Sequence, residues 1–114
     1  MTVELNVYSG RPNPAWELSE NERAELVARL KDLPVADAAI SDAGLGYRGF
    51  VILKLGRTGE LPRRIRVYGG IVAMENGGHP RFYRDTHEIE PYLLEQAAGR
   101  GYGAIVEGIL PKQP

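Results

Sequence analysis

The sequence contains no cysteine and no long apolar run. Without cysteine there can be no disulfide scaffold, no thiolate metal site and no cysteine nucleophile. No apolar stretch approaches the roughly 20 residues that cross a bilayer, and the opening MTVELNVYSG forms neither a basic leader nor an apolar signal segment. These absences favour a soluble, cytoplasmic protein with no membrane partner.

An excess of charge of either sign is also missing. The chain carries 14 Lys and Arg against 15 Asp and Glu, which argues against a general binder of polyanions. Its glycine-containing segments match neither a phosphate-binding loop nor a dinucleotide fingerprint, and no Gly-x-Ser-x-Gly motif occurs. We therefore expect no nucleotide-cofactor enzyme and, more generally, no cofactor.

Alternating and continuous apolar runs predict the strands. Apolar residues alternate with polar ones over residues 3–7 and again over 63–68, the pattern of strands with one buried face. The run FVILKL, residues 50–55, is apolar on both faces and therefore fits a central strand, joined to 63–68 as a hairpin. Residues 71–74 and 81–84 favour a second hairpin, because the Asn-Gly turn of ENGG lies between them.

Two segments predict amphipathic helices. A capping box, Ser19 with Glu22, precedes leucines at helical spacing, which predicts a helix over residues 20–33 that ends before the next proline. A second helix is expected to begin near residues 88–90, because the proline that follows is tolerated in a first turn. For the tail, residues 103–114, we expect a short edge strand.

Together these elements indicate an α+β fold, a mainly antiparallel sheet of about four to five strands with two helices packed on one face. The length of 114 residues, 43% of them hydrophobic, fits a single domain over residues 1–114 with one modest core. The opposite sheet face is then the place to look for a site. The expected core comprises Leu5, Val7, Leu26, Leu30, Phe50 or Ile52, Ile65, Val67, Leu93 and Ala97.

Positive charge is concentrated in the middle of the nearly neutral chain. Between residues 48 and 84, eight Lys and Arg stand against two Glu, a formal +6, with aromatic side chains interleaved. Arginine forks and aromatic rings together suit an anionic ligand, an acidic peptide or single-stranded nucleic acid. The alternative is structural: Arg64 and Arg66 would pair with Glu4 across strands or face acidic helices.

The segment YSGRPNPAW, residues 8–16, interrupts the chain directly after the first strand. Its glycine permits a departure from the strand, and its two prolines restrict the loop, so that less entropy is lost on binding. If the first strand lies beside residues 63–68, this loop forms the rim of their shared polar face. Trp16 is either an aromatic wall of that site or a core side chain. The candidate ligand-binding residues are Tyr8, Ser9, Arg11, Asn13, Trp16, Arg64, Arg66 and Tyr68.

One short segment resembles a catalytic or metal-binding set. The segment HPRFYRDTHE contains His79, Asp85, His87 and Glu88, and a two-histidine, one-carboxylate site needs three such ligands converging on one point. The alternative is again structural, because the Asp85 and Glu88 spacing also resembles a helix cap and both histidines fit exposed turn positions.

We therefore expect a small noncatalytic binding or protein-interaction module. Its polar sheet face and SGRPNP loop would recognise an anionic small molecule, an acidic peptide or a partner protein. The alternative is a small metal-dependent or acid–base enzyme that uses the four residues of the HPRFYRDTHE segment. Nucleic acid is a less favoured partner, which a steep salt dependence of binding would reveal.

Overall fold

Six strands form one antiparallel sheet in the computed structural model, which describes residues 1–7, 12–40, 47–53, 63–75 and 79–109. The strands are β1 (Thr2–Leu5), β2 (Ala15–Glu17), β3 (Phe50–Leu53), β4 (Arg64–Tyr68), β5 (Ile71–Glu75) and β6 (Arg81–Arg84). Their order across the sheet is β2-β1-β3-β4-β5-β6. The predicted α+β class is confirmed, with six strands in the described residues instead of four to five.

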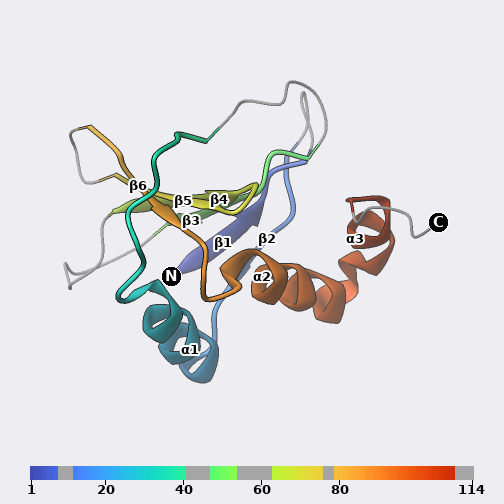
Figure 1. Cartoon of the computed structure of the whole chain (residues 1–114). Helices are drawn as coiled ribbons and strands as arrows, with labels where there is room; N and C mark the ends of the chain where they lie inside the picture. The colour runs from blue at the N-terminus through green and yellow to red at the C-terminus, as the bar shows by residue number, and fades with distance from the viewer. Residues whose placement is uncertain (8–11, 41–46, 54–62, 76–78, 110–114) are drawn as a thin grey trace.

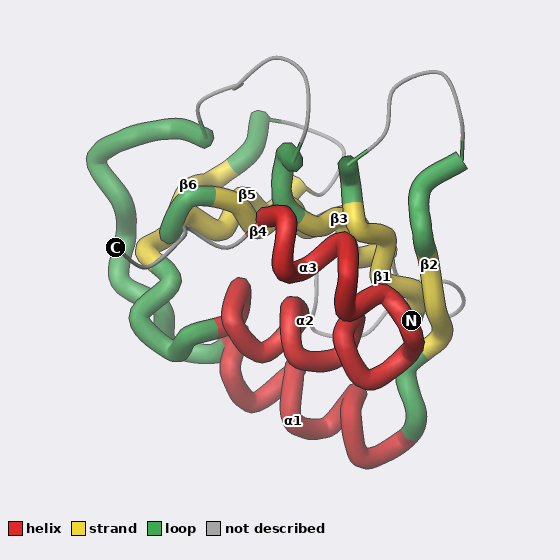
Figure 2. Tube along the Cα trace, turned by 90° about the vertical axis from the view of Figure 1, so that its right-hand side faces the viewer, coloured by secondary structure: helices red, strands yellow, loops and turns green. Residues whose placement is uncertain are grey.

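The helices α1 (Glu20–Leu30) and α2 (Ile89–Ala97) lie side by side against one face of the sheet (Figures 1 and 2). The predicted capping box starts α1: Glu22 N–H donates to Ser19 Oγ at 3.2 Å, and Ser19 N–H donates to the Glu22 carboxylate at 2.9 Å. The helix ends three residues earlier than predicted, because Lys31 is extended and Asp32 has a positive φ of 57°. No helix in the described part of the chain is long and apolar enough to cross a membrane.

The expectation of an edge strand in the tail is wrong for residues 103–109, which form a third helix, α3 (Gly103–Ile109). A kinked turn, η1 (Ala98–Tyr102), joins it to α2, and Gly101 supplies the positive φ of 94° that the kink requires. The helix packs through Val106, which is buried in the core. A short apolar run does not by itself distinguish strand from helix, and here the glycine kink and the core contact decide for helix.

The strand order does not meet the condition under which the first strand and residues 63–68 would be direct neighbours. β1 does not lie beside β4, because β3 pairs with both, as Val3 with Ile52 and Ile52 with Ile65 show. β3 is apolar throughout, and even Val51, on the face away from α1 and α2, is only 7% exposed. A strand that is apolar on both faces buries the most apolar surface in the centre of a sheet, as the sequence of β3 predicted. β3 therefore lies between β1 and β4.

The core lies between the sheet and the two helices. Side chains of β1, β3, β4 and β5 that alternate toward the helices are almost fully buried, and α1 and α2 contribute their apolar stripes. The predicted core is confirmed: Leu5, Leu26, Leu30, Phe50, Ile52, Ile65, Val67, Leu93 and Ala97 are buried, and Val7 is partly buried against them.

Replacing Leu30 by alanine tests this packing. Leu30 is 4% exposed, so the substitution leaves a cavity between α1 and the sheet and should lower the free energy of unfolding by about 2 to 5 kcal/mol. Urea unfolding followed by the fluorescence of Trp16 measures the change. Arg23→Ala on the exposed side of the same helix is the control, and an unchanged midpoint for Leu30→Ala would refute the position assigned to Leu30.

Candidate functional site

The face of the sheet opposite α1 and α2 carries the polar side chains of β1 and β4. Val3 and Leu5 of β1 are buried toward the helices, so Glu4 and Asn6 alternate to the other face. In β4 the same alternation places Arg64, Arg66 and Tyr68 on that face. We call this surface the uncovered face, because the helices α1 and α2 lie on the other side (Figure 1).

The polar residues of β1 and the predicted site residues of β4 share the uncovered face, but β1 and β4 are not adjacent strands. Glu4 pairs with Val51, and Val51 pairs with Arg66, so one strand separates the two polar groups. Two strand spacings amount to about 10 Å. Arg64 has its carboxylate neighbour on the other side, with Nη1 3.9 Å from Glu75 of β5.

Asn13 ties the end of the proline-rich loop to β1. Its Oδ1 accepts a hydrogen bond from Val7 N–H at 3.0 Å, and its Nδ2 donates to Glu4 and to Asn6 Oδ1, both at 3.1 Å. Arg48 Nη2 also donates to Asn6 Oδ1, at 3.1 Å. The loop therefore ends on the uncovered face, and the Asn13 amide holds it there. Tyr8, Ser9 and Arg11, the other predicted loop residues, lie outside the described residues.

Trp16 is a core side chain, which is one of the two roles that the sequence allowed for it. It belongs to β2, is 8% exposed, and donates from Nε1 to Gln96 Oε1 at 2.9 Å. Its ring stacks on Tyr102 at 6.0 Å and meets the edge of Phe50 at 6.4 Å. These contacts lie on the helix side of the sheet, which favours the structural reading of Trp16 over the ligand-contacting one.

Tyr68 is connected to the helix layer through Tyr47 and Glu90. The rings of Tyr47 and Tyr68 meet edge to face at 5.5 Å, and Tyr47 Oη donates to the Glu90 carboxylate at 2.5 Å. The other Glu90 oxygen accepts from Gly70 N–H at 3.3 Å, in the two-residue turn where Gly69 and Gly70 both have positive φ. Burial and the adjacent carboxylate raise the pKa of Tyr47 above its ordinary value.

Three of the four residues proposed for catalysis, Asp85, His87 and Glu88, have structural contacts at the start of α2. Both carboxylate oxygens of Asp85 accept backbone hydrogen bonds, from Ile89 at 2.7 Å and Glu90 at 2.9 Å, so Asp85 caps the helix. His87 Nδ1 lies 2.7 Å from the carbonyl oxygen of Arg29. Within the described residues, which include His79 and Glu88, no three His, Asp or Glu side chains form a group able to hold a metal ion.

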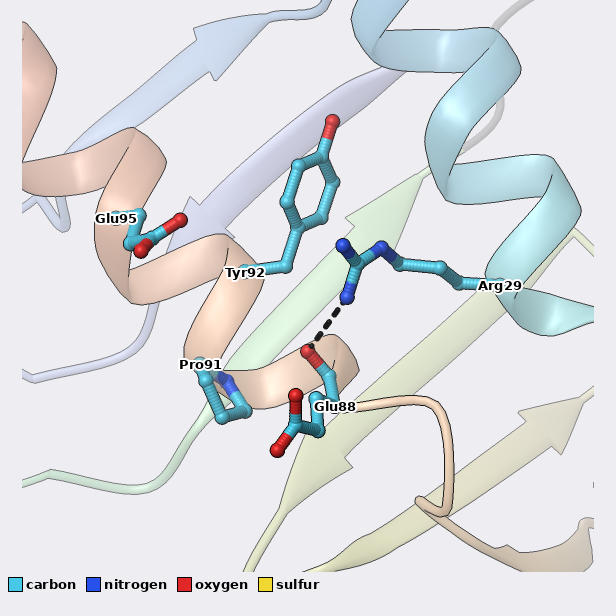
Figure 3. Close-up of a pocket in the computed structure, with 5 residues that line it drawn as sticks. All are labelled: Arg29, Glu88, Pro91, Tyr92 and Glu95. Carbon is cyan, nitrogen blue, oxygen red and sulfur yellow. Dashed lines mark hydrogen bonds between the residues drawn. The ribbon is translucent and has the colours of Figure 1, made fainter.

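A cleft that the sequence analysis did not identify lies between α1 and α2 (Figure 3). It has a volume of about 190 Å³ and is lined by Arg29, Glu88, Pro91, Tyr92 and Glu95. We call it the α1–α2 cleft. The sequence signal was the spacing of positions 92 and 95, which places both side chains on one side of a helix, with Glu88 directly before its start.

Arg29, the only cation among the described residues that line the α1–α2 cleft, is engaged by the protein itself. Arg29 Nη1 donates to the carbonyl oxygens of His87 at 2.9 Å and Glu88 at 3.2 Å, and its guanidinium lies 4.5 Å from the centre of the Tyr92 ring. Its Nε pairs with Glu25 at 2.8 Å. Arg29 thus joins the end of α1 to the start of α2, and the carboxylates of Glu88 and Glu95 make no ion pair with another described residue.

Replacing Tyr47 by phenylalanine tests the connection between the sheet and α2. Loss of a hydrogen bond to a carboxylate should lower the free energy of unfolding by about 1.5 to 3 kcal/mol at pH 7. Because the folded pKa of Tyr47 is raised, its contribution is complete below pH 10, the ordinary value, and is lost as the pH rises above it. Denaturant unfolding at pH 7 to 11 should therefore show the two proteins converging in alkali, relative to a Tyr83→Phe control. A constant difference across this range would contradict the assignment.

Comparison with protein-family models, with curated proteins and with solved structures finds no match to this chain. No residue role is therefore carried over from a relative. The function has to be argued from the geometry of the uncovered face and of the clefts.

Proposed function

We propose that the protein is a noncatalytic, cytoplasmic binding module whose uncovered face takes the carboxylates of an acidic peptide. The observation that carries the proposal is the alternation of Arg64, Arg66 and Tyr68 along β4 on the face away from α1 and α2. Residues two apart in a strand are separated by about 6.8 Å, which is also the spacing of alternate side chains in an extended peptide. An acidic peptide is for this reason favoured over an anionic small molecule or a folded partner.

The surroundings of the two arginines support carboxylate binding. The Arg64 side chain is 48% exposed, and its ion pair with Glu75, at 3.9 Å, is long enough for an incoming carboxylate to compete. Arg66 is flanked across the ladder by Val51 and Ala73, which are 7% and 3% exposed. Arg66 is itself partly buried, and a guanidinium that is partly shielded from water makes a stronger paired hydrogen bond to a carboxylate than one in open solvent.

The edge of this surface is held in place before any ligand arrives. The hydrogen bonds of Asn13 to Val7, Glu4 and Asn6 fix the loop end about two strands from Arg66. A prearranged rim reduces the ordering that binding requires. The enzyme alternative has no comparable observation in its favour, because the carboxylate of Asp85 is occupied by the α2 cap.

A fluorescein-labelled peptide of alternating glutamate and serine is the probe for this proposal, with fluorescence anisotropy as the measurement. Arg66→Ala and Arg64→Ala should each weaken binding about tenfold, or ~1.4 kcal/mol, through loss of a charge-assisted hydrogen bond. Thermal unfolding of Arg64→Ala should change little, because the side chain is half exposed. The same titration tests Arg11→Ala, which the sequence alone predicts to weaken binding.

Arg23→Ala on α1 is the matched control, since it removes the same charge from the helix layer. Equal affinity in the wild-type protein, Arg64→Ala and Arg66→Ala, or no binding of the acidic peptide at all, would contradict the proposal. Preference for an oligothymidylate, with a steep loss of affinity as salt increases, would instead identify nucleic acid as the partner.

A further inference from the structure

A second cleft adjoins the first along α2. It has a volume of about 400 Å³ and is lined by Pro91, Leu94, Glu95, Ala98 and Val106, from α2, the η1 turn and α3. We call it the α2–α3 cleft. Pro91 and Glu95 line both clefts, so the two hollows flank one exposed ridge of α2.

The two clefts differ in chemistry. In the α2–α3 cleft all lining side chains except Glu95 are apolar, which suits a leucine or phenylalanine side chain from a partner. The α1–α2 cleft has Glu88 and Glu95 at its walls, while its Arg29 is held by backbone carbonyls and Glu25. In Figure 3 the side chains of Glu88 and Glu95 lie on either side of Pro91 and Tyr92. The ridge therefore combines an apolar hollow with two acidic side chains.

We propose that the α2 ridge docks a basic amphipathic helix of a partner protein. An apolar side chain of that helix enters the α2–α3 cleft, and lysine or arginine side chains one turn away face Glu95 and Glu88. Charge complementarity selects this occupant: neither carboxylate has an ion pair with another described residue, and a cation beside an apolar cleft satisfies both features at once. This surface is separate from the uncovered face and has the opposite charge preference.

The probe is a fluorescein-labelled helical peptide of about 14 residues, roughly four turns, with leucine on one face, lysine beside it and alanine elsewhere. Anisotropy titrations at low salt should show binding that weakens with added salt. Two control peptides, with glutamate in place of lysine and with glutamine in place of leucine, should not bind.

Two substitutions at exposed positions of the ridge test the two halves of the site separately. Glu95→Gln removes one carboxylate and should weaken binding about two- to fivefold, the size of one exposed ion pair. Ala98→Gln places a polar side chain in the apolar cleft and should weaken binding more strongly, about tenfold. Glu20→Gln, which removes an exposed carboxylate from α1, is the matched control and should leave the affinity unchanged.

The proposal would be overturned if Glu95→Gln and Ala98→Gln bound the basic peptide as tightly as the Glu20→Gln control. It would also be overturned if the glutamate peptide bound as tightly as the lysine peptide. Sedimentation of the free protein provides a second test: a dimer that Ala98→Gln dissociates would assign the ridge to a second copy of this chain. Arg64→Ala and Arg66→Ala should leave binding of the basic peptide unchanged. The two proposed surfaces can therefore fail independently.

Discussion

Burial of one sheet face by α1 and α2 is the constraint on which the rest of the structure depends. The apolar side chains of β1, β3, β4 and β5 that alternate toward these helices form the core, so every second residue of the same strands must face the other way. In β4 those residues are Arg64, Arg66 and Tyr68. The polar surface is thus a direct consequence of the buried one, and a shift of β4 by one residue would exchange the two.

Polar contacts at the start of α2 determine how the helix layer meets the sheet. Asp85 caps the helix, and Arg29 donates to the carbonyl oxygens of His87 and Glu88, where Glu88 has an unusual positive φ of 54°. A strained backbone of this kind persists when its surroundings hold it, and here α1 does so. Of the residues that resembled a catalytic set in the sequence, Asp85 and His87 therefore connect the start of α2 to its surroundings through their side chains, and Glu88 does so through its carbonyl oxygen.

Alternation, capping and turn signals were sufficient to predict the faces of the strands, the start of α1 and the two hairpins, β3 with β4 and β5 with β6, but not the place of β1 in the sheet. The pattern of residues 63–68 indicates which side chains are buried, but it carries no information on whether β1 also lies beside them. The link between Tyr47 and Glu90 joins residues 43 positions apart, and no local signal marks it. Trp16 was ambiguous for a related reason, since its partner Gln96 becomes visible only when β2 and α2 are packed together.

The distribution of charge follows the same division into layers. Residues 48–84 supply four of the six strands, β3 to β6, and carry a formal +6, while the remaining segments, which include every helix in the described residues, carry −7. The apolar core lies between the sheet and the helices α1 and α2, and it keeps the charges of the two layers apart. A nearly neutral chain can in this way carry a basic central segment and acidic flanking segments at once, because the two are assigned to different elements of the fold.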